Sequence, residues 1–181
     1  MHAWDRPHAG GPGSLADEIT LRTARDEDFP DLLSMWRELM DLHVRLDPRF
    51  ALSEDADERF EAYVDTAIHR DDYLVRLALL GHHPVGFSVS CILPNSPVYR
   101  AHWIGYVNDL CVTESVRGRG VGEVLVDDAV SWLTRSGAET VEVYVAHANE
   151  GARRFWRRMG GQEYLERLSL DLGKYPARRG R

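Results

Sequence analysis

One stretch of the sequence combines groups that could bind an anion with a carboxylate that could accept a proton. It runs from Asp109 to Gly122 and reads Asp-Leu-Cys-Val-Thr-Glu-Ser-Val-Arg-Gly-Arg-Gly-Val-Gly. Its first half is apolar enough for a strand, and its glycine-rich second half is followed by apolar residues at helical spacing. A strand that turns through glycines into a helix directs unpaired backbone N–H groups and the positive end of the helix dipole at one point. The stretch therefore predicts a phosphate-binding turn.

Two common nucleotide-binding loops do not fit these glycines. A P-loop needs a Gly-Lys pair followed by Ser or Thr, and the pair at 173–174 is followed by Tyr175. A dinucleotide-binding fingerprint is spaced G-x-G-x-x-G at the first strand–helix crossover, whereas Gly118, Gly120 and Gly122 are spaced G-x-G-x-G late in the chain. A connection that merely turns the chain is the plainer alternative, but it needs neither alternate glycines nor interleaved arginines.

Composition narrows the classes of protein to which the chain can belong. A length of 181 residues suits one domain with its own core. No run approaches the roughly 20 apolar residues that span a bilayer, and the polar start lacks a signal-peptide core, so we expect a cytoplasmic protein without membrane contact. The net charge of −7 argues against nucleic acid as a partner. Cys91 and Cys111 lie in apolar runs and are interpreted as buried reduced thiols.

The hydrophobic pattern predicts a mixed α/β fold around this stretch. Expected strands cover 19–23, 73–80, 85–93, 104–112, 141–145 and 168–172, and expected helices cover 29–43, 54–69, 121–133 and 149–159, the first of them capped by carboxylates at 26–28. We expect a flexible tail at 1–17, one domain at 18–173 and a basic tail at 174–181. His82 and His83 lie in a turn without a carboxylate or cysteine at ligand spacing, so no metal site is expected.

The same stretch resembles a known family. The run from Arg117 to Gly122 matches the [QR]-x-x-G-x-[GA] pyrophosphate loop of the GNAT superfamily of acyl-CoA N-acyltransferases. Residues 19–28 look like the opening strand and helix cap of that family, and 84–87 is similar to its third strand. Its C-terminal N-x-x-A-x-x-[FL]-Y-x-x-x-G pattern is met at Asn149, Ala152, Phe155 and Gly160. The resemblance covers roughly 19–172 and implies a single domain whose mostly antiparallel, V-splayed sheet is flanked by about four helices.

The resemblance also implies a cofactor, acetyl-CoA, and a set of contacts for it. The pyrophosphate would lie on the turn, where glycines allow close backbone approach and arginines add charge. These contacts would come from Arg117, Gly118, Arg119, Gly120, Val121 and Gly122. The pantetheine arm would pair with the backbone of Leu110, Cys111 and Val112, and the N–H of Leu110 or Cys111 would stabilise the tetrahedral intermediate. Asn149 would contact the cofactor, and it is equally well explained as a helix N-cap.

Asp109 is the candidate general base. An alkylammonium has a pKa of about 10.4 and must lose a proton before its nitrogen can attack a thioester. A carboxylate between apolar strand residues is unusual without a role or a partner, although an outward, solvated acid is an equal alternative. Cys111 as a nucleophile is a weaker hypothesis than Cys111 as a packing residue.

One position departs from the family pattern. Trp156 stands where most relatives have the tyrosine that protonates the departing thiolate, and an indole N–H has no usable proton. The thiolate could leave unaided, or Tyr144, Tyr164 or a water could take over this task. Gly161 also stands in place of a family phenylalanine.

Two functional hypotheses follow. The first is an N-acetyltransferase that moves acetyl from acetyl-CoA to a primary amine, on a small molecule or a peptide, within a ternary complex. The second is a non-catalytic acyl-CoA-binding module that senses or regulates. The acceptor would be selected by 41–50 and 94–103, and neither its identity nor a homodimer can be decided from sequence.

Overall fold

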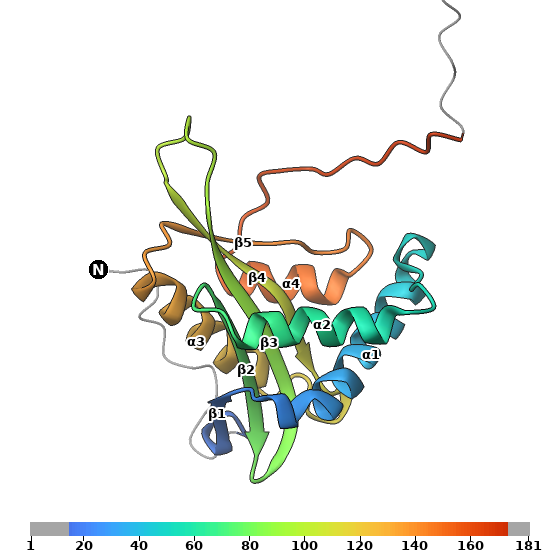
Figure 1. The fold of residues 1–181 in the computed structure, drawn as a ribbon, viewed down its shortest axis with the longest axis vertical. Helices are drawn as coiled ribbons and strands as arrows, with labels where there is room; N and C mark the ends of the chain where they lie inside the picture. Colours follow the sequence, from blue (N-terminus) through green and yellow to red (C-terminus); the bar gives the residue numbers. More distant parts are fainter. Residues whose placement is uncertain (1–14, 174–181) are drawn as a thin grey trace, which may run out of the picture.

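The computed structural model describes residues 15–173 and contains a five-stranded sheet in the order β1-β2-β3-β4-β5 (Figure 1). Neighbours along the first four strands are antiparallel, whereas β4 and β5 run parallel. The strands are β1 (Ile19–Thr23), β2 (Tyr73–Leu80), β3 (His83–Pro94), β4 (Trp103–Val112) and β5 (Thr140–Val143). The mostly antiparallel sheet that the sequence predicts is confirmed.

Four helices flank this sheet within the described residues, as expected. They are α1 (Phe29–Leu46), α2 (Ala56–Ile68), α3 (Val121–Arg135) and α4 (Glu150–Arg158). α1 and α2 pack on one face of the sheet, where Trp36 and Phe60 stack with ring centroids 4.4 Å apart above the fully buried Phe87. α3 covers the other face through Leu125 and Leu133, both fully buried. Side chains alternate across strands, so β4 contributes to both cores.

The carboxylate expected to cap α1 has a different task. Asp28 occupies the N-cap of α1 but makes no capping hydrogen bond there. Its buried carboxylate instead accepts two hydrogen bonds of 2.6 Å from the guanidinium of Arg22 and one from the N–H of Arg25. This pair ties β1 to the start of α1.

The sheet splits between β4 and β5. The two strands pair only along Ile104–Val107 and Thr140–Val143, and β4 then continues to Val112 without a β5 partner. A bulge precedes the split: Val89 of β3 faces Asp109 and the next residue of β3 faces Val107, so Asn108 is an extra residue in β4. A bulge bends a strand and redirects its side chains. The V-shaped splay of the sheet is thus confirmed.

The C-terminal part corrects one prediction. No strand forms at 168–172, and Leu168, Leu170 and Leu172 are 84%, 69% and 82% exposed. Their alternation has the period of a strand, but a strand also needs a hydrogen-bonding neighbour, and this segment runs away from the sheet (Figure 1). β5 likewise ends at Val143 rather than at 145.

The N-terminal boundary also differs from the expected one. A short helix covers Leu15–Glu18, and Leu15 is buried against Val85 and Val121. Packing therefore begins within the stretch expected to be a flexible tail, because Leu15 covers the end of the α3 core. The rest of that tail and the basic tail at 174–181 lie outside the described residues.

Candidate active site

A cavity of about 640 Å³ opens where β4 and β5 separate. Its walls are the second half of β4, the glycine turn, the start of α3, the segment after β5 and α4, and α1 closes one end with Leu39, Leu42 and His43. Every cofactor-contact residue expected from the sequence lines this cavity except Arg119, which is exposed elsewhere on the turn.

The turn has the backbone geometry of an anion site. Gly118 and Gly120 have φ values of 74° and 90°, in the left-handed region that side chains disfavour. Gly120 is the N-cap of α3 and lines the cavity together with Val121 and Gly122, so the free N–H groups expected at a helix N-terminus lie at this wall. At Gly122 a Cβ would lie 3.3 Å from the ring of Phe155, so glycine here allows α3 to approach α4 closely.

The two arginines of the turn are placed differently. The guanidinium of Arg117 donates a 2.8 Å hydrogen bond to the carbonyl of Val112 and forms an ion pair with Glu38 of α1. The Glu38 carboxylate also accepts the N–H of Glu114, so it binds the turn twice. Arg117 therefore fixes the turn against α1 while lining the cavity, and the exposed Arg119 lies outside the lining.

Alternate residues of β4 face opposite cores. Leu110 and Val112 pack with the α3 core, whereas Cys111 points to α1, where its Sγ is 3.2 Å from the carbonyl oxygen of Met35. Burial raises the pKa of the Cys111 thiol to about 12. A protonated thiol held by a carbonyl is a packing group, and this geometry gives no support to a nucleophilic role.

Asp109 lines the cavity at the bulge. Its Oδ2 accepts a hydrogen bond of 3.2 Å from the hydroxyl of Tyr63 on α2. Burial raises the pKa of the Asp109 carboxyl to about 6, and the hydrogen bond from Tyr63 opposes part of that rise. The structure thus places Asp109 in the inward position and not in the solvated one. A carboxyl that ionises near neutral pH inside a cleft suits proton abstraction.

Asn149 and Trp156 both line the cavity. Asn149 caps α4, with its Oδ1 accepting the N–H of Ala152 at 3.0 Å, and it lines the cavity as well. Trp156 lines the cavity and packs against the buried cluster that contains Val107 and Leu133. Its ring meets Phe155 edge-on at 5.2 Å.

The two tyrosines considered as substitute proton donors, Tyr144 and Tyr164, differ in their distance from the cavity. Tyr144 lines the cavity but is 75% exposed, and its ring stacks on Tyr106 at 6.3 Å. The hydroxyl of Tyr164 donates to Glu142, and Tyr164 lies outside the cavity lining. Of the two, only Tyr144 reaches the cavity.

The structure adds residues that the sequence did not single out. Tyr63 donates to the carboxylate of Asp109, and Asn108 donates to the hydroxyl of Tyr63. Arg158 lines the cavity from α4, and His43 lines it from α1. Burial lowers the pKa of His43, whose ring lies 5.2 Å from that of Phe50. Asn108 adjoins Asp109 in the sequence and could have been noticed, whereas nothing in the sequence links Tyr63 to Asp109.

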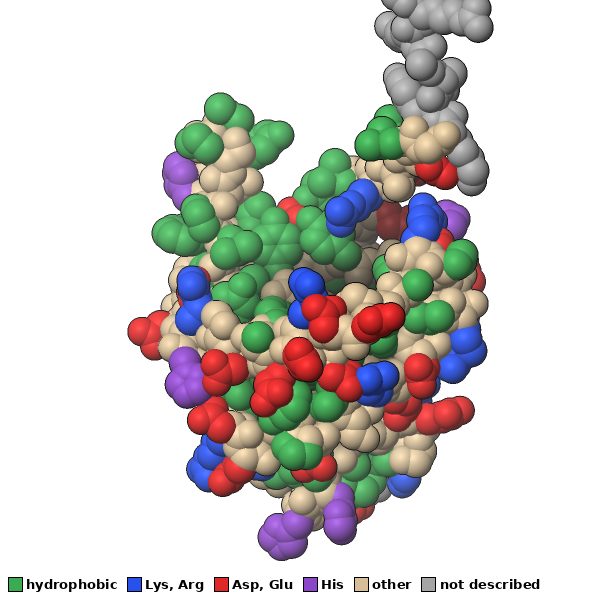
Figure 2. Space-filling model, turned by 45° about the vertical axis from the view of Figure 1, so that its right-hand side comes forward, with side chains coloured by type: hydrophobic (Ala, Val, Ile, Leu, Met, Phe, Trp, Pro, Cys, Tyr) green, Lys and Arg blue, Asp and Glu red, His purple; other side chains and the backbone are tan. Residues whose placement is uncertain are grey.

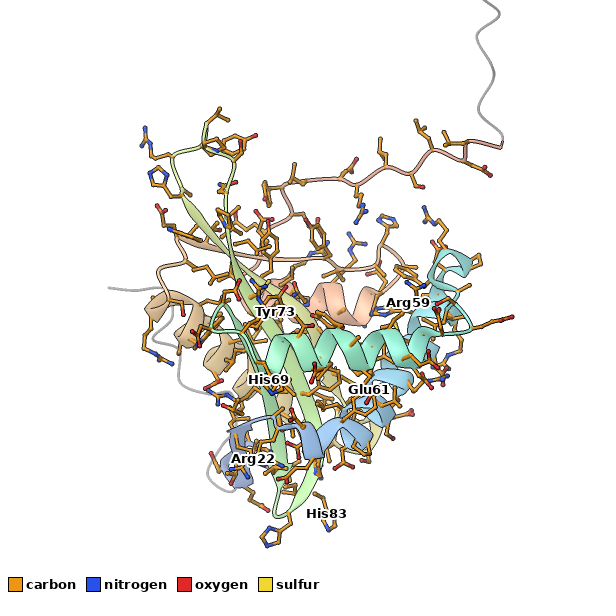
Figure 3. The ribbon with its side chains drawn as sticks, in the orientation of Figure 1. Arg22, Arg59, Glu61, His69, Tyr73 and His83 are labelled. Carbon is orange, nitrogen blue, oxygen red and sulfur yellow. The ribbon has the colours of Figure 1, made fainter. Side chains whose placement is uncertain are left out.

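Other segments considered earlier lie away from the cavity. The 94–103 loop forms a projecting hairpin tip with Val98 82% and Tyr99 62% exposed, and hydrophobic side chains gather there in Figure 2. It contributes nothing to the cavity lining. His83 is the first residue of β3, at the end of the molecule opposite the 94–103 hairpin tip (Figure 3). No helix among residues 15–173 is long and apolar enough to cross a membrane.

Comparison with known proteins identifies the class that this fold and cavity define. Residues 36–161 match the model of the acetyltransferase (GNAT) family, so the chain belongs to that family. An uncharacterised N-acetyltransferase of Methanocaldococcus jannaschii is 31% identical over 80 residues, which are 44% of this chain and 35% of that protein. The chain thus matches about a third of that relative's length.

Solved structures show the same fold at lower sequence identity. A tetramutant of a Bacillus halodurans protein superposes with a TM-score of 0.74 at 23% identity and covers 84% of this chain and 99% of its own. A predicted acetyltransferase from Clostridium acetobutylicum, crystallised with acetyl-CoA, gives a TM-score of 0.72 at 18% identity and covers 87% and 98%.

Proposed function

We propose that the protein transfers the acetyl group of acetyl-CoA to a primary amine by direct attack within a ternary complex. The observation that carries this proposal is the cavity between β4 and β5, which joins a glycine turn at a helix N-terminus to the half-buried carboxylate of Asp109. The family uses acetyl-CoA, and the Clostridium acetobutylicum neighbour was crystallised with it.

The cofactor would be held mainly by backbone. Its pyrophosphate fits the turn at Gly118–Gly122, because unpaired N–H groups and the helix dipole converge there. The pantetheine arm fits along Leu110–Val112, whose edge toward β5 has no ladder partner in the described structure. Its amides would complete the hydrogen bonding that the split leaves open.

The acetyl transfer would use Asp109 as the base. The ammonium of the acceptor passes a proton to the Asp109 carboxylate, and the freed amine forms a bond to the thioester carbon. Backbone N–H groups of Leu110 or Cys111 stabilise the oxyanion. The intermediate collapses with cleavage of the C–S bond, and coenzyme A leaves as a thiolate. The second proton that the attacking nitrogen must lose passes through a water molecule to this thiolate, which gives the neutral amide and free coenzyme A. Trp156 would shape the pocket around the sulfur.

The acceptor would lie at the α1 end of the cavity. Leu39, Leu42 and His43 line that end, and Leu42 and His43 fall within the 41–50 segment expected to select the substrate. The net charge of −7 suits a cationic amine, which is the form that an alkylamine takes near neutral pH.

The test is acetyl transfer by the full chain, followed as released free thiol against a panel of amines, with CoA affinity measured by titration calorimetry. Amine-dependent thiol release supports the proposal. Tight CoA binding with no turnover on any amine overturns it and favours the non-catalytic acyl-CoA-binding module.

A further inference from the structure

The bulge in β4 places two consecutive polar side chains on the same tyrosine. Asn108 is the extra residue in β4, and its Nδ2 lies 3.3 Å from the hydroxyl oxygen of Tyr63. The next residue, Asp109, accepts from that same hydroxyl at 3.2 Å. In a regular strand these two side chains would point to opposite faces. The bulge is therefore what brings the amide, the phenol and the carboxylate together.

The three groups are ordered by their hydrogen-bonding capacities. A carboxylate only accepts, and an amide NH₂ only donates, whereas a phenol can do either. Because Asn108 donates to the phenol oxygen, the single proton of Tyr63 is directed at Oδ2 of Asp109. The other oxygen, Oδ1, is left for a proton from a substrate.

Tyr63 also lies between two hollows of the molecule. It adjoins Asp109, which lines the β4–β5 cavity, and it lines a shallower hollow between α1 and α2 with Trp36, Leu52 and Phe60. Glu61, exposed on α2, is labelled in Figure 3, and acidic side chains form a band across the face shown in Figure 2.

From this geometry we propose that Tyr63 is a positioning residue for the transfer, which orients the Asp109 carboxylate and keeps it ionised near neutral pH, and that Asn108 fixes the direction of the Tyr63 proton. This inference rests on the proposed function. It goes further by assigning a task to α2, which supplies none of the residues that line the cavity.

The pH dependence that follows is set by the groups around Asp109. Tyr63 of α2 donates a hydrogen bond to the Asp109 carboxylate, and Cys111 is the titratable neighbour of Asp109 on β4. The other charged or titratable groups that line the cavity are His43 of α1, Arg117 of the turn, Glu123 of α3, Tyr144 after β5 and Arg158 of α4, and Cys91 of β3 contacts Asn108. Burial raises the pKa of the Asp109 carboxyl and the hydrogen bond from Tyr63 lowers it, so losing the phenol donor should move the titration of this carboxyl to higher pH.

The test compares Tyr63→Phe with wild type in the pH profile of kcat/KM. The acid limb of the wild-type profile is assigned to Asp109 by its absence in Asp109→Asn. In Tyr63→Phe we expect its midpoint to rise by about one pH unit, since a hydrogen bond to a charged group has about that effect. Asn108→Ala should shift it in the same direction by less. Tyr63→Phe should add little to the loss in Asp109→Asn, because the two residues act together.

The matched control is Tyr73→Phe. Tyr73 is a half-buried tyrosine of β2, labelled in Figure 3, and makes no hydrogen bond to Asp109 in the described structure. Its substitution should leave the acid limb in place. Circular dichroism and thermal unfolding of each variant check that the fold is retained.

A second readout does not depend on activity. Carbon-13 NMR of the carboxyl groups, with the Asp109 signal assigned by its loss in Asp109→Asn, should show a midpoint near the value of about 6 and a higher one in Tyr63→Phe. Equal midpoints in wild type and Tyr63→Phe overturn the positioning role even if acetyl transfer is confirmed. A shifted midpoint without amine-dependent turnover would instead support the Tyr63–Asp109 coupling and reject the proposed function.

Discussion

A carboxylate used as a base must be dehydrated enough to hold a proton and solvated enough to lose it. Asp109 meets both conditions, because burial raises its pKa to about 6 while one hydrogen bond from Tyr63 still favours the ionised form. In the fully apolar interior the carboxyl would stay neutral, and on the surface it would be too weak a base. The protonation state of this residue is therefore the most informative quantity to measure.

Replacing the base should change the rate most at low pH. Asp109→Asn keeps the shape and can still accept the hydrogen bond from Tyr63, so we expect folded protein with kcat/KM lower by about 10²- to 10⁴-fold near pH 7. The deficit should shrink toward pH 10, where the amine loses its proton to solvent. Steady-state rates from pH 5.5 to 10 check this. Wild-type rates over that whole range would remove Asp109 from the mechanism.

The indole at position 156 should matter little for proton transfer. Trp156→Phe removes the N–H but preserves an aromatic ring against Phe155 and the buried cluster that contains Val107. Because coenzyme A is a good leaving group as its thiolate, we expect kcat to change by less than about threefold, well below the usual effect of removing a general acid. A loss of a hundredfold would show that the indole N–H hydrogen-bonds to the departing sulfur. Turnover at saturating amine is the measurement.

At the scale of elements, the glycine turn is held by more than its glycines. Arg117 links the carbonyl of Val112 to Glu38, so α1, the end of β4 and the turn form one unit. A ligand on the turn thereby contacts the helix that closes the acceptor end of the cavity. Cofactor binding and acceptor binding share this unit.

Disrupting the turn should remove the cofactor and preserve the fold. Arg117→Ala combined with Gly120→Asp places a carboxylate at the N-cap of α3, at φ 90°, and removes a nearby positive charge. We expect CoA affinity to fall by at least about a hundredfold, as like charges in a partly buried site repel by several kcal/mol. Calorimetry measures the affinity and circular dichroism the fold.

The control for this double variant is Glu38→Gln. It removes the ion pair that ties the turn to α1 but leaves the positive charge of Arg117 available to phosphate. It should bind CoA at least as tightly as wild type. Unchanged affinity in the double variant would show that the phosphate lies elsewhere.

Local sequence patterns were enough to predict most helices and strands and the glycine turn, but they did not predict the long-range contacts. Gly118 and Gly120 have positive φ values, which glycine adopts far more readily than other residues, so these glycines indicated a tight turn. The helical spacing of apolar residues after Gly122 indicated α3. Tyr63 lies 46 residues from Asp109, and their contact depends on the bulge at Asn108, which has no sequence signature. At 168–172 the sequence predicted a strand that does not form. Alternating leucines are typical of a strand, but they do not show whether a hydrogen-bonding neighbour strand lies beside it.

At the scale of the whole molecule, a functional carboxyl with a raised pKa lowers stability. The Asp109 pKa is about 6 in the folded protein and close to 3.9 in the unfolded chain, so the folded state binds the proton more tightly. Its contribution is fully present below pH 4 and is lost as the pH rises through 6. The sign is opposite to that of Asp28, whose pKa is lowered by the hydrogen bond from Arg22.

Asp109→Asn should therefore stabilise the protein at neutral pH while it impairs catalysis. The shift corresponds to about 2 kcal/mol of unfolding free energy, after allowing for partial exposure of the carboxyl. We expect a higher midpoint of urea unfolding than wild type at pH 7.5 and a smaller difference at pH 4.5. Equal midpoints at both values would mean that the carboxyl is ordinarily solvated.

The short parallel seam between β4 and β5 has a consequence for how the molecule opens. Within residues 15–173 its four residue pairs are the only ladder of β5, and they join segments separated by the whole of α3, whereas β2, β3 and β4 follow one another along the chain as antiparallel neighbours. Such a seam forms late in folding and opens first under native conditions. Amide hydrogens of Val141–Val143 should thus exchange faster than those of β2 and β3. A ligand that fills the split should slow this exchange selectively, because it would occupy the place beside β4 that another strand would take in a continuous sheet.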